Sequence, residues 1–243
     1  MKKLYILIAL TIVFLLLSAC AGNDGNIPQN TLQPSPEIPD TPTEQPTASP
    51  DASTPPDPQN GGDIGVGIQV QAYGEVVISL EFEKQSGAAS NQYAVWIEDM
   101  NGNVIKSLYA SRWTADGGYQ TRPDSIALWV ERAGLAGMSS SQVDAVSGAT
   151  PGTGLQLHVW DLTDLDGNTV LQGNYKFFVE GTLRWKNFVL FSGIITLGNN
   201  PVTIEADAEF HYEGTDRYDA LTEDSAENRM ISAVIATFTT TKG

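Results

Sequence analysis

Cysteine and histidine are almost absent from this chain, which has one cysteine, Cys20, and two histidines, His158 and His211, among 243 residues. A single cysteine can form no disulfide within the chain, so core packing has to stabilise the fold. The two histidines lack the close spacing typical of a zinc site. The sequence also contains no nucleophile elbow, phosphate-binding loop or dinucleotide fingerprint. No residue set supports a hydrolase, and the sequence favours a protein without enzymatic activity.

Positive charge is scarce as well. Thirteen basic residues face 29 acidic ones, which gives a formal net charge of −16 at pH 7. A polyanion of this size is repelled by nucleic acid and by anionic membrane surfaces. We therefore expect no nucleic-acid partner and no electrostatic attraction to a membrane.

The longest apolar run lies at the N-terminus, where Lys2 and Lys3 precede an apolar segment from Leu4 to Leu17. This segment is shorter than the ~20 residues that a bilayer-spanning helix needs, which indicates a secretory signal peptide. It ends in Leu-Ser-Ala-Cys, so residues 1–20 resemble a bacterial lipoprotein signal with Cys20 as the acylated residue. The resemblance implies anchoring in the lipid bilayer through Cys20, on the extracytoplasmic face of the cell membrane. Two acyl chains suffice for stable anchoring.

Residues 21–63 are predicted to form a disordered linker. Ten of the thirteen prolines lie between Pro28 and Pro58, among Thr, Ser, Gln, Asp and Glu and with almost no large apolar side chain. Such a segment cannot bury enough surface to offset the entropy of ordering it. We expect a spacer between the membrane anchor and a folded domain that covers residues 64–243.

The region 64–243 is predicted to be an all-β domain, an antiparallel β-sandwich with a short helical insertion. Strand patterns of alternating or β-branched and aromatic residues occupy the segments 67–72, 76–82, 93–98, 104–109, 155–160, 174–181, 187–197, 202–211 and 230–239. Asn101-Gly102 separates two of them and predicts a hairpin with a type I′ turn. The helical insertion is expected over 123–133, where apolar residues have helical spacing, with a second short helix from 139 to 144.

Several side chains of the predicted strands are expected to face or adjoin the core, namely Val95, Ile97, Leu157, Val159, Phe177 and Val179. Trp96 and Trp160 are expected in the core too. Trp113 lies in the polar loop 114–119 and is the tryptophan expected to be exposed.

The run Asp164-x-Asp166-Gly167 invites comparison with a calcium-binding loop. With Gly167 at the sixth position of such a loop, the first and twelfth positions are Leu162 and Gly173. Neither side chain can supply the oxygen ligand that those positions require. The run therefore predicts a hairpin turn rather than a calcium site.

The segment Asp144-Ala-Val-Ser-Gly-Ala-Thr150 carries the strongest functional signal. It resembles the acceptor motif of bacterial flavin transferases, in which the hydroxyl of the last Thr takes FMN through a phosphodiester bond. The resemblance implies covalent FMN at Thr150, with Asp144, Ser147, Gly148 and Ala149 as the accompanying cofactor-binding residues. The alternative is a tight turn in which small residues are ordinary.

A second resemblance extends over roughly Val77 to Leu197. Trp160-Asp-x-x-Asp-x-Asp-Gly, followed by Gly173-x-Tyr175, is similar to a signature of immunoglobulin-like domains such as the C-terminal domain of flagellar hook-capping proteins. The order of motifs also resembles a bacterial family of periplasmic proteins of unknown function, often encoded beside flavin transferases. The resemblance implies an immunoglobulin-like fold, a flavin transferase and redox proteins as partners, and an accessory role in flavin-dependent extracytoplasmic electron transfer.

A second function remains open, in which the domain is a non-enzymatic binding or adhesion module that recognises glycan or protein through its loops. Arg112, Arg122 and Arg132 surround the predicted helix in a chain that has few basic residues. They could receive an FMN phosphate or the carboxylate of a partner. An exposed Trp113 could stack on an isoalloxazine ring or on a sugar.

Overall fold

The computed structural model describes residues 69–241. The expected signal peptide with Cys20 and the expected linker 21–63 lie outside the described residues. Within the described part of the chain, no helix has the length and apolar character needed to cross a membrane.

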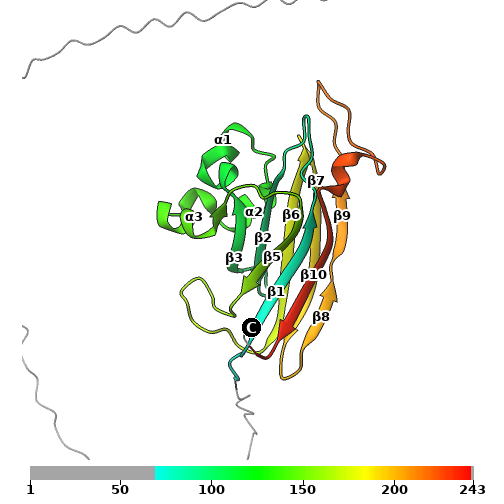
Figure 1. Ribbon diagram of the computed structural model, residues 1–243. Coiled ribbons are helices and arrows are strands. Elements are labelled where there is room, and N and C mark those ends of the chain that lie inside the picture. The colour runs from blue at the N-terminus through cyan, green and yellow to red at the C-terminus, as the bar shows by residue number, and fades with distance from the viewer. Residues whose placement is uncertain (1–68, 242–243) are drawn as a thin grey trace, which may run out of the picture. The chain divides into compact units, whose positions relative to one another are not determined.

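Two β-sheets stack to form a sandwich, and Figure 1 shows their strands running alongside one another. One sheet has four strands in the order β5-β1-β10-β8, and the other has six in the order β4-β3-β2-β6-β7-β9. All strand pairs are antiparallel except β3 with β4, which is parallel. The strands are β1 Glu75–Phe82, β2 Gln92–Glu98, β3 Val104–Ser111, β4 Ser147–Gly148, β5 Gly154–Trp160, β6 Gly173–Arg184, β7 Asn187–Leu197, β8 Val202–Glu205, β9 Asp207–His211 and β10 Ile231–Thr239. The predicted antiparallel sandwich is confirmed.

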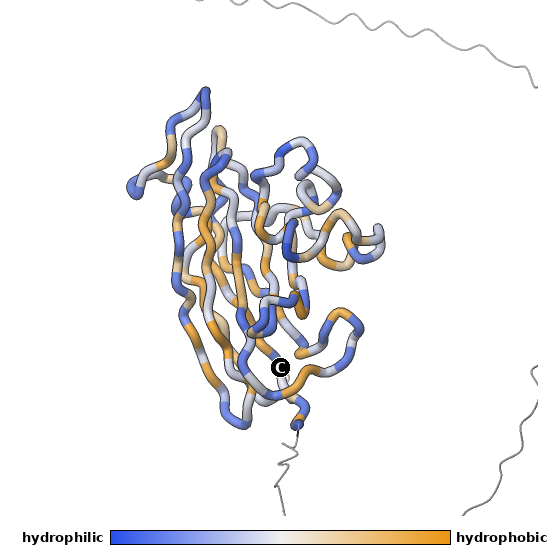
Figure 2. The backbone as a smooth tube through the Cα atoms, turned by 180° about the vertical axis from the view of Figure 1, so that it is seen from behind, coloured by the Kyte–Doolittle hydropathy of each residue, from blue (hydrophilic) through white to orange (hydrophobic). Residues whose placement is uncertain are grey.

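The main core lies between the two sheets and follows the period of two along each strand. In β1 every second residue from Val76 to Phe82 is buried, and β10 and β6 contribute facing apolar side chains. Figure 2 shows apolar stretches along the strands and polar residues at the ends where the chain turns. Four of the residues expected at the core are buried, namely Val95, Ile97, Phe177 and Val179. Trp96 and Trp160 are also fully buried, as predicted.

The side chains of strand β5 face the opposite sides from those predicted. Leu157 and Val159 are 59% and 53% exposed, so their placement at the core was wrong. The inward positions belong instead to His158 and Trp160, and the His158 ring contacts Tyr93. Because side chains alternate between faces, burying the large Trp160 ring fixes the phase of the whole strand.

Three further local predictions need correction. The described residues of the expected strand 67–72 form only an isolated bridge between Gln71 and Leu171. The expected strand 202–211 divides at Ala206, which donates its N–H to the Val234 carbonyl, and β8 and β9 join different sheets. The Asn101-Gly102 hairpin is present, but Asn101 has no positive φ and the turn is not type I′. The Asp99 carboxylate organises this turn by accepting the Asn101 N–H.

The helical insertion covers the outer face of the six-stranded sheet next to β2 and β3 (Figure 1). It consists of η1 Thr114–Gly118, α1 Tyr119–Thr121, α2 Ala127–Arg132, η2 Leu135–Gly137 and α3 Ser140–Val146, and a further short helix, η3 Ala226–Met230, precedes β10. A second core forms beneath it, in which Trp96 and Trp129 are fully buried. The helix predicted over 123–133 is present but shorter, since Ile126 adopts a left-handed φ of 42° immediately before α2.

The first turn of α2 is held by side chains of β6 rather than by a local cap. The Glu180 carboxylate accepts the N–H groups of Leu128 and Trp129 at 3.1 and 2.8 Å, and the Thr182 hydroxyl accepts the Ile126 N–H at 2.7 Å. These three acceptors satisfy N–H groups that a helix start leaves without partners. The sequence around 123–133 contains no trace of them, because they come from a strand about fifty residues later.

Burial makes Glu180 a source of pH dependence. Desolvation raises the pKa of Glu180 from 4.5 to about 7, against the opposing effect of its two backbone hydrogen bonds. The folded domain thus holds this proton more tightly than the unfolded chain does. The contribution of Glu180 to stability is complete below about pH 4.5 and is lost as the pH rises through about 7.

We expect Glu180→Gln to remove this loss. Because one pKa unit corresponds to about 1.4 kcal/mol, the free energy of unfolding of the wild type should fall relative to the variant by at most about 3 kcal/mol between about pH 5 and pH 8. Urea unfolding of both proteins across this range measures the difference. A pH-independent difference in the free energy of unfolding between the two proteins reflects the lost hydrogen bond and does not bear on the pKa assignment. Parallel pH profiles would contradict the assignment.

Candidate functional site

The segment Asp144–Thr150 begins on helix α3 and ends on a loop at the edge of the six-stranded sheet. Ser139 caps α3 by accepting the Gln142 N–H, and the Gln142 side chain accepts the Ser139 N–H in return. This capping box fixes the start of the helix that the sequence predicted near the serines. The chain then forms β4, in which Ser147 and Gly148 pair with the end of β3. The motif thus starts on a helix and leaves the sheet as an exposed loop.

Gly148 is in close contact with the ring of Tyr109 from β3. A Cβ atom at position 148 would lie 2.6 Å from a ring carbon of Tyr109, a distance that only glycine avoids. The Tyr109 hydroxyl donates to the Ala149 carbonyl at 3.0 Å and lies 3.4 Å from that of Gly148. The glycine of the motif therefore has a structural role here, because it lets the ring hold the backbone just before Thr150.

The three hydroxyl and carboxyl side chains of the motif have different surroundings. Asp144 is exposed and lies 3.8 Å from Arg112, an ion pair that contributes little in solvent. The Ser147 hydroxyl is buried and has no hydrogen-bond partner. Thr150 is partly exposed, and within residues 69–241 its hydroxyl makes no hydrogen bond. Thr150 is therefore chemically available, whereas Ser147 is shielded.

Two tyrosines and a histidine form an aromatic cluster next to this loop. The rings of Tyr93 and Tyr109 stack with centroids 4.4 Å apart, and the Tyr93 hydroxyl lies 3.3 Å from His158 Nε2. Burial lowers the pKa of His158 to about 4 and raises the pKa of Tyr93. His158 is thus neutral at physiological pH and supports the site through packing. Nothing local in the sequence indicates this cluster, since its members come from three strands.

Helix α3 lies between two open hollows. One has a volume of about 390 Å³ and includes Met138, Val146 and Leu165 in an apolar wall, with Lys106 at its edge. The Lys106 ammonium donates to the Thr163 hydroxyl at 3.1 Å and to the Asp164 carbonyl. The other has a volume of about 380 Å³ on the side of Asp144 and is more polar. The first hollow combines apolar walls with one cation and is the better match to a planar cofactor ring.

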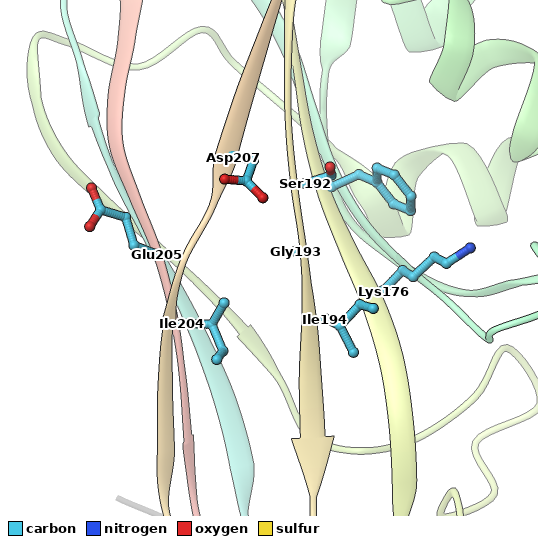
Figure 3. A pocket seen from close by; sticks show the side chains of 8 residues that line it. Lys176, Ser192, Gly193, Ile194, Ile204, Glu205 and Asp207 are labelled. Atoms are coloured by element: carbon cyan, nitrogen blue, oxygen red, sulfur yellow. The ribbon is translucent and has the colours of Figure 1, made fainter.

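A further hollow of about 480 Å³ lies on the six-stranded sheet, where β8 and β9 diverge. Figure 3 shows Lys176 and Glu205 extending away from one another on opposite sides of it. Its polar groups therefore do not converge on a common point, and it lacks the arrangement expected of a binding site.

The three arginines that surround the helix in sequence do not form one site. Arg112 pairs with Asp144. Arg132 bonds the buried carboxylate of Glu98 at 3.0 Å, which ties the end of α2 to β2. Arg122 lies at a different hollow, near Trp185. The three arginines therefore do not share one phosphate-binding site in this structure.

The Asp164 run forms a turn, as predicted. The Asp164 carboxylate accepts the N–H groups of Asp166 and Asn168 at 2.9 and 2.8 Å, and Thr163 and Thr169 on either side form an isolated β-bridge. The Asn168 backbone bond contributes most to lowering the pKa of Asp164. In the described part of the chain, no three His, Cys, Asp or Glu side chains gather as a metal site would require.

Comparison with known proteins gives one family. No curated protein and no solved structure matches this chain. A family described as predicted periplasmic proteins, DUF2271, matches residues 75–213. The matched region covers more than half of the chain and runs from β1 past β9, so it includes the whole motif segment. The resemblance to a bacterial family of periplasmic proteins of unknown function is thereby confirmed. The chain belongs to the DUF2271 family of predicted periplasmic proteins.

Proposed function

We propose that this protein is a lipid-anchored extracytoplasmic protein that carries FMN covalently on Thr150 and serves as an accessory component in flavin-dependent electron transfer. In the attachment step, a flavin transferase would join the Thr150 oxygen to the FMN-side phosphorus of a flavin dinucleotide, the pyrophosphate P–O bond would break, and the nucleoside monophosphate would leave with the hydroxyl proton. The hydroxyl loses its proton, and the protein gains the mass of FMN less water. The redox chemistry belongs to the bound flavin.

The observation that carries the proposal is the placement of the Thr150 hydroxyl. It lies on a loop at the sheet edge, partly exposed and without a hydrogen-bond partner among the described residues. The two preceding carbonyls are held by Tyr109, so the backbone that a transferase has to approach is already ordered. An ordered loop with one unengaged hydroxyl suits covalent modification, because little entropy remains to be lost on binding the enzyme.

The apolar hollow beside α3 supports the proposal as a cover for the flavin ring. Met138, Val146 and Leu165 would contact the apolar part of the isoalloxazine, and Lys106 would provide a positive charge near its polar edge.

Co-expression with a secreted flavin transferase, followed by intact mass measurement, tests attachment. Unmodified protein beside a modified control acceptor would refute it.

Anchoring is proposed to depend on Cys20 alone. We expect Cys20→Ser to abolish acylation, because serine has no thiol to accept the lipid. The variant should remain uncleaved by the lipoprotein peptidase or leave the membrane fraction. Carbonate washing followed by immunoblotting measures both outcomes. A variant that lacks its signal peptide and still pellets with membranes would contradict the lipobox assignment.

The second candidate function is a binding module for glycan or protein. The observation in its favour is Trp113, which is 46% exposed although its neighbour Thr114 is fully buried. Tryptophan is enriched at interfaces, because its ring offers a large apolar surface and its N–H a polar contact. The two functions are compatible, since Trp113 belongs to a hollow that does not include the motif residues.

A further inference from the structure

One hollow outside the motif segment combines aromatic walls with a partly buried cation. It lies where the helical insertion meets the turn between β6 and β7 and has a volume of about 480 Å³. Its lining consists of Ser90, Gln92, Trp113, Thr121, Arg122 and Trp185. Hydroxyl, amide, guanidinium and indole groups therefore surround a single space, which is the composition of a site for a polar ring.

Arg122 has one side of its guanidinium group without a partner. Its Nη1 donates to the Ser90 hydroxyl at 3.1 Å, whereas Nε and Nη2 are buried and have no acceptor. These two nitrogens form the edge that binds a carboxylate through two parallel hydrogen bonds. Burial lowers the pKa of Arg122, and no carboxylate within 4 Å pairs with it in the described residues. Arg122 is partly buried, and the charge of Asp124 acts on it without a direct ion pair. An anion on the two shielded nitrogens that lack acceptors would therefore complete this site.

Trp185 has an unusual backbone conformation for an aromatic residue. It occupies the first position of the two-residue turn between β6 and β7 with a φ of 53°, where glycine is the ordinary residue. Its ring stacks on Tyr218 with centroids 4.9 Å apart, and the Arg122 guanidinium lies 5.5 Å from its centroid. The Trp185 indole N–H is buried without an acceptor. Such a conformation persists where surrounding contacts hold it, and here Tyr218 and Arg122 hold the Trp185 ring.

Trp113 provides the accessible wall. It belongs to neither core cluster and is half exposed, and its ring packs closely on Gly118, where an added Cβ would lie 2.5 Å from a ring carbon. The exposed Thr121 adds a hydroxyl that matches the hydroxyl groups of a sugar, whereas the Gln92 amide is buried and already engaged by Thr114 and Ser90. A half-exposed indole beside a hydroxyl and a guanidinium group favours a sugar ring over a purely apolar ligand.

We propose that this hollow binds an acidic sugar, a hexuronic acid of an extracellular polysaccharide, with its carboxylate on the Nε–Nη2 edge of Arg122 and its ring against Trp113. The chain is strongly acidic overall, with a formal charge of −16. Recognition of an anion therefore depends on the local pairing with Arg122 rather than on the overall field.

Tetragalacturonic acid added to the full chain in detergent, expressed without a flavin transferase, tests the proposal separately from flavin attachment. We expect saturable binding by calorimetry, accompanied by a change in tryptophan fluorescence. The methyl-esterified tetramer should bind at least about tenfold more weakly, because the ester removes the charge that Arg122 pairs with. A hexaglutamate peptide, which offers carboxylates without sugar rings, should not bind.

Two variants locate the site. Arg122→Lys should weaken binding about tenfold by removing the two-bonded edge, and Trp113→Ala should weaken it to a similar extent by removing the ring contact. Tyr73→Ala is the control, since Tyr73 is an exposed aromatic residue outside the hollow. If the Arg122→Lys variant does not fold, the affinity of the Trp113→Ala variant still decides the proposal, because Trp113 is half exposed. Absent binding, equal affinity for the ester or the peptide, or unchanged affinity in Trp113→Ala would each overturn the proposal.

Discussion

Thr150→Ala should abolish covalent FMN attachment completely. The variant lacks the only oxygen on this residue that can accept the phosphate, and the neighbouring Ser147 hydroxyl is buried and cannot substitute for it. Co-expressed with a flavin transferase, the wild type should gain the mass of FMN less water and fluoresce in a denaturing gel. The variant should do neither. Its melting temperature should hardly change, because surface substitutions of this kind alter stability by about 0.5 kcal/mol or less.

Thr153→Ala is the matched control for this experiment. Thr153 lies three residues further along the same loop, and its hydroxyl accepts the Lys84 N–H at 3.0 Å. Modification should therefore be retained in Thr153→Ala. Asp144→Ala should lose most of the label if the carboxylate assists the transferase. Comparison with Arg112→Ala separates that role from the ion pair at 3.8 Å. A labelled Thr150→Ala protein would place the FMN elsewhere and end the proposal.

Phe177→Ala should produce the largest loss of stability. Phe177 is fully buried at the centre of β6, and its ring occupies the space beside Gly193 of β7, where an added Cβ would lie 2.6 Å from the ring. Removing the ring leaves a cavity between the two sheets, and such changes cost about 3–5 kcal/mol. Urea unfolding followed by tryptophan fluorescence measures the effect.

Phe210→Ala provides the comparison for this second experiment. Phe210 lies on the edge strand β9 and is 38% exposed, so its truncation should cost far less. Similar losses in the two variants would show that burial in the sandwich does not determine stability at these positions. A loss at Phe177 below about 1 kcal/mol would contradict the core assignment, because full burial of an aromatic ring contributes more than that.

The sequence by itself predicted the fold class and most of its elements. Residues such as Val95 and Phe177 lie in patterns that depend on a period of two, and that period follows from the geometry of one strand. The same holds for the short helix that starts at the serines, although its capping box of Ser139 and Gln142 was not predicted. The Asp164 turn is another local feature. Each of these could be predicted because its partners are close in sequence.

The motif was also visible in the sequence, but nothing in its neighbourhood indicated how its loop is held. Tyr109 contacts Gly148 and Ala149 from almost forty residues away, and Tyr93 and His158 complete the cluster from two other strands. The exposed hydroxyl of Thr150 and the buried one of Ser147 look equivalent in the sequence. Only the pairing of β4 with β3 distinguishes them.

The sequence patterns failed where contacts between segments far apart in the chain decide which face or sheet a strand joins. In β5 both faces carry apolar residues, and burial of Trp160 against the core decides which face turns inward. At Ala206 one continuous strand pattern divides between two sheets, because β8 pairs with β10 and β9 pairs with β7. Likewise, Arg122 and Trp185 meet only after the insertion packs on the β6–β7 turn. Local periodicity thus determined the strands and the core of this protein. The tertiary structure decided which faces, edges and side chains meet, because those contacts depend on segments far apart in the chain.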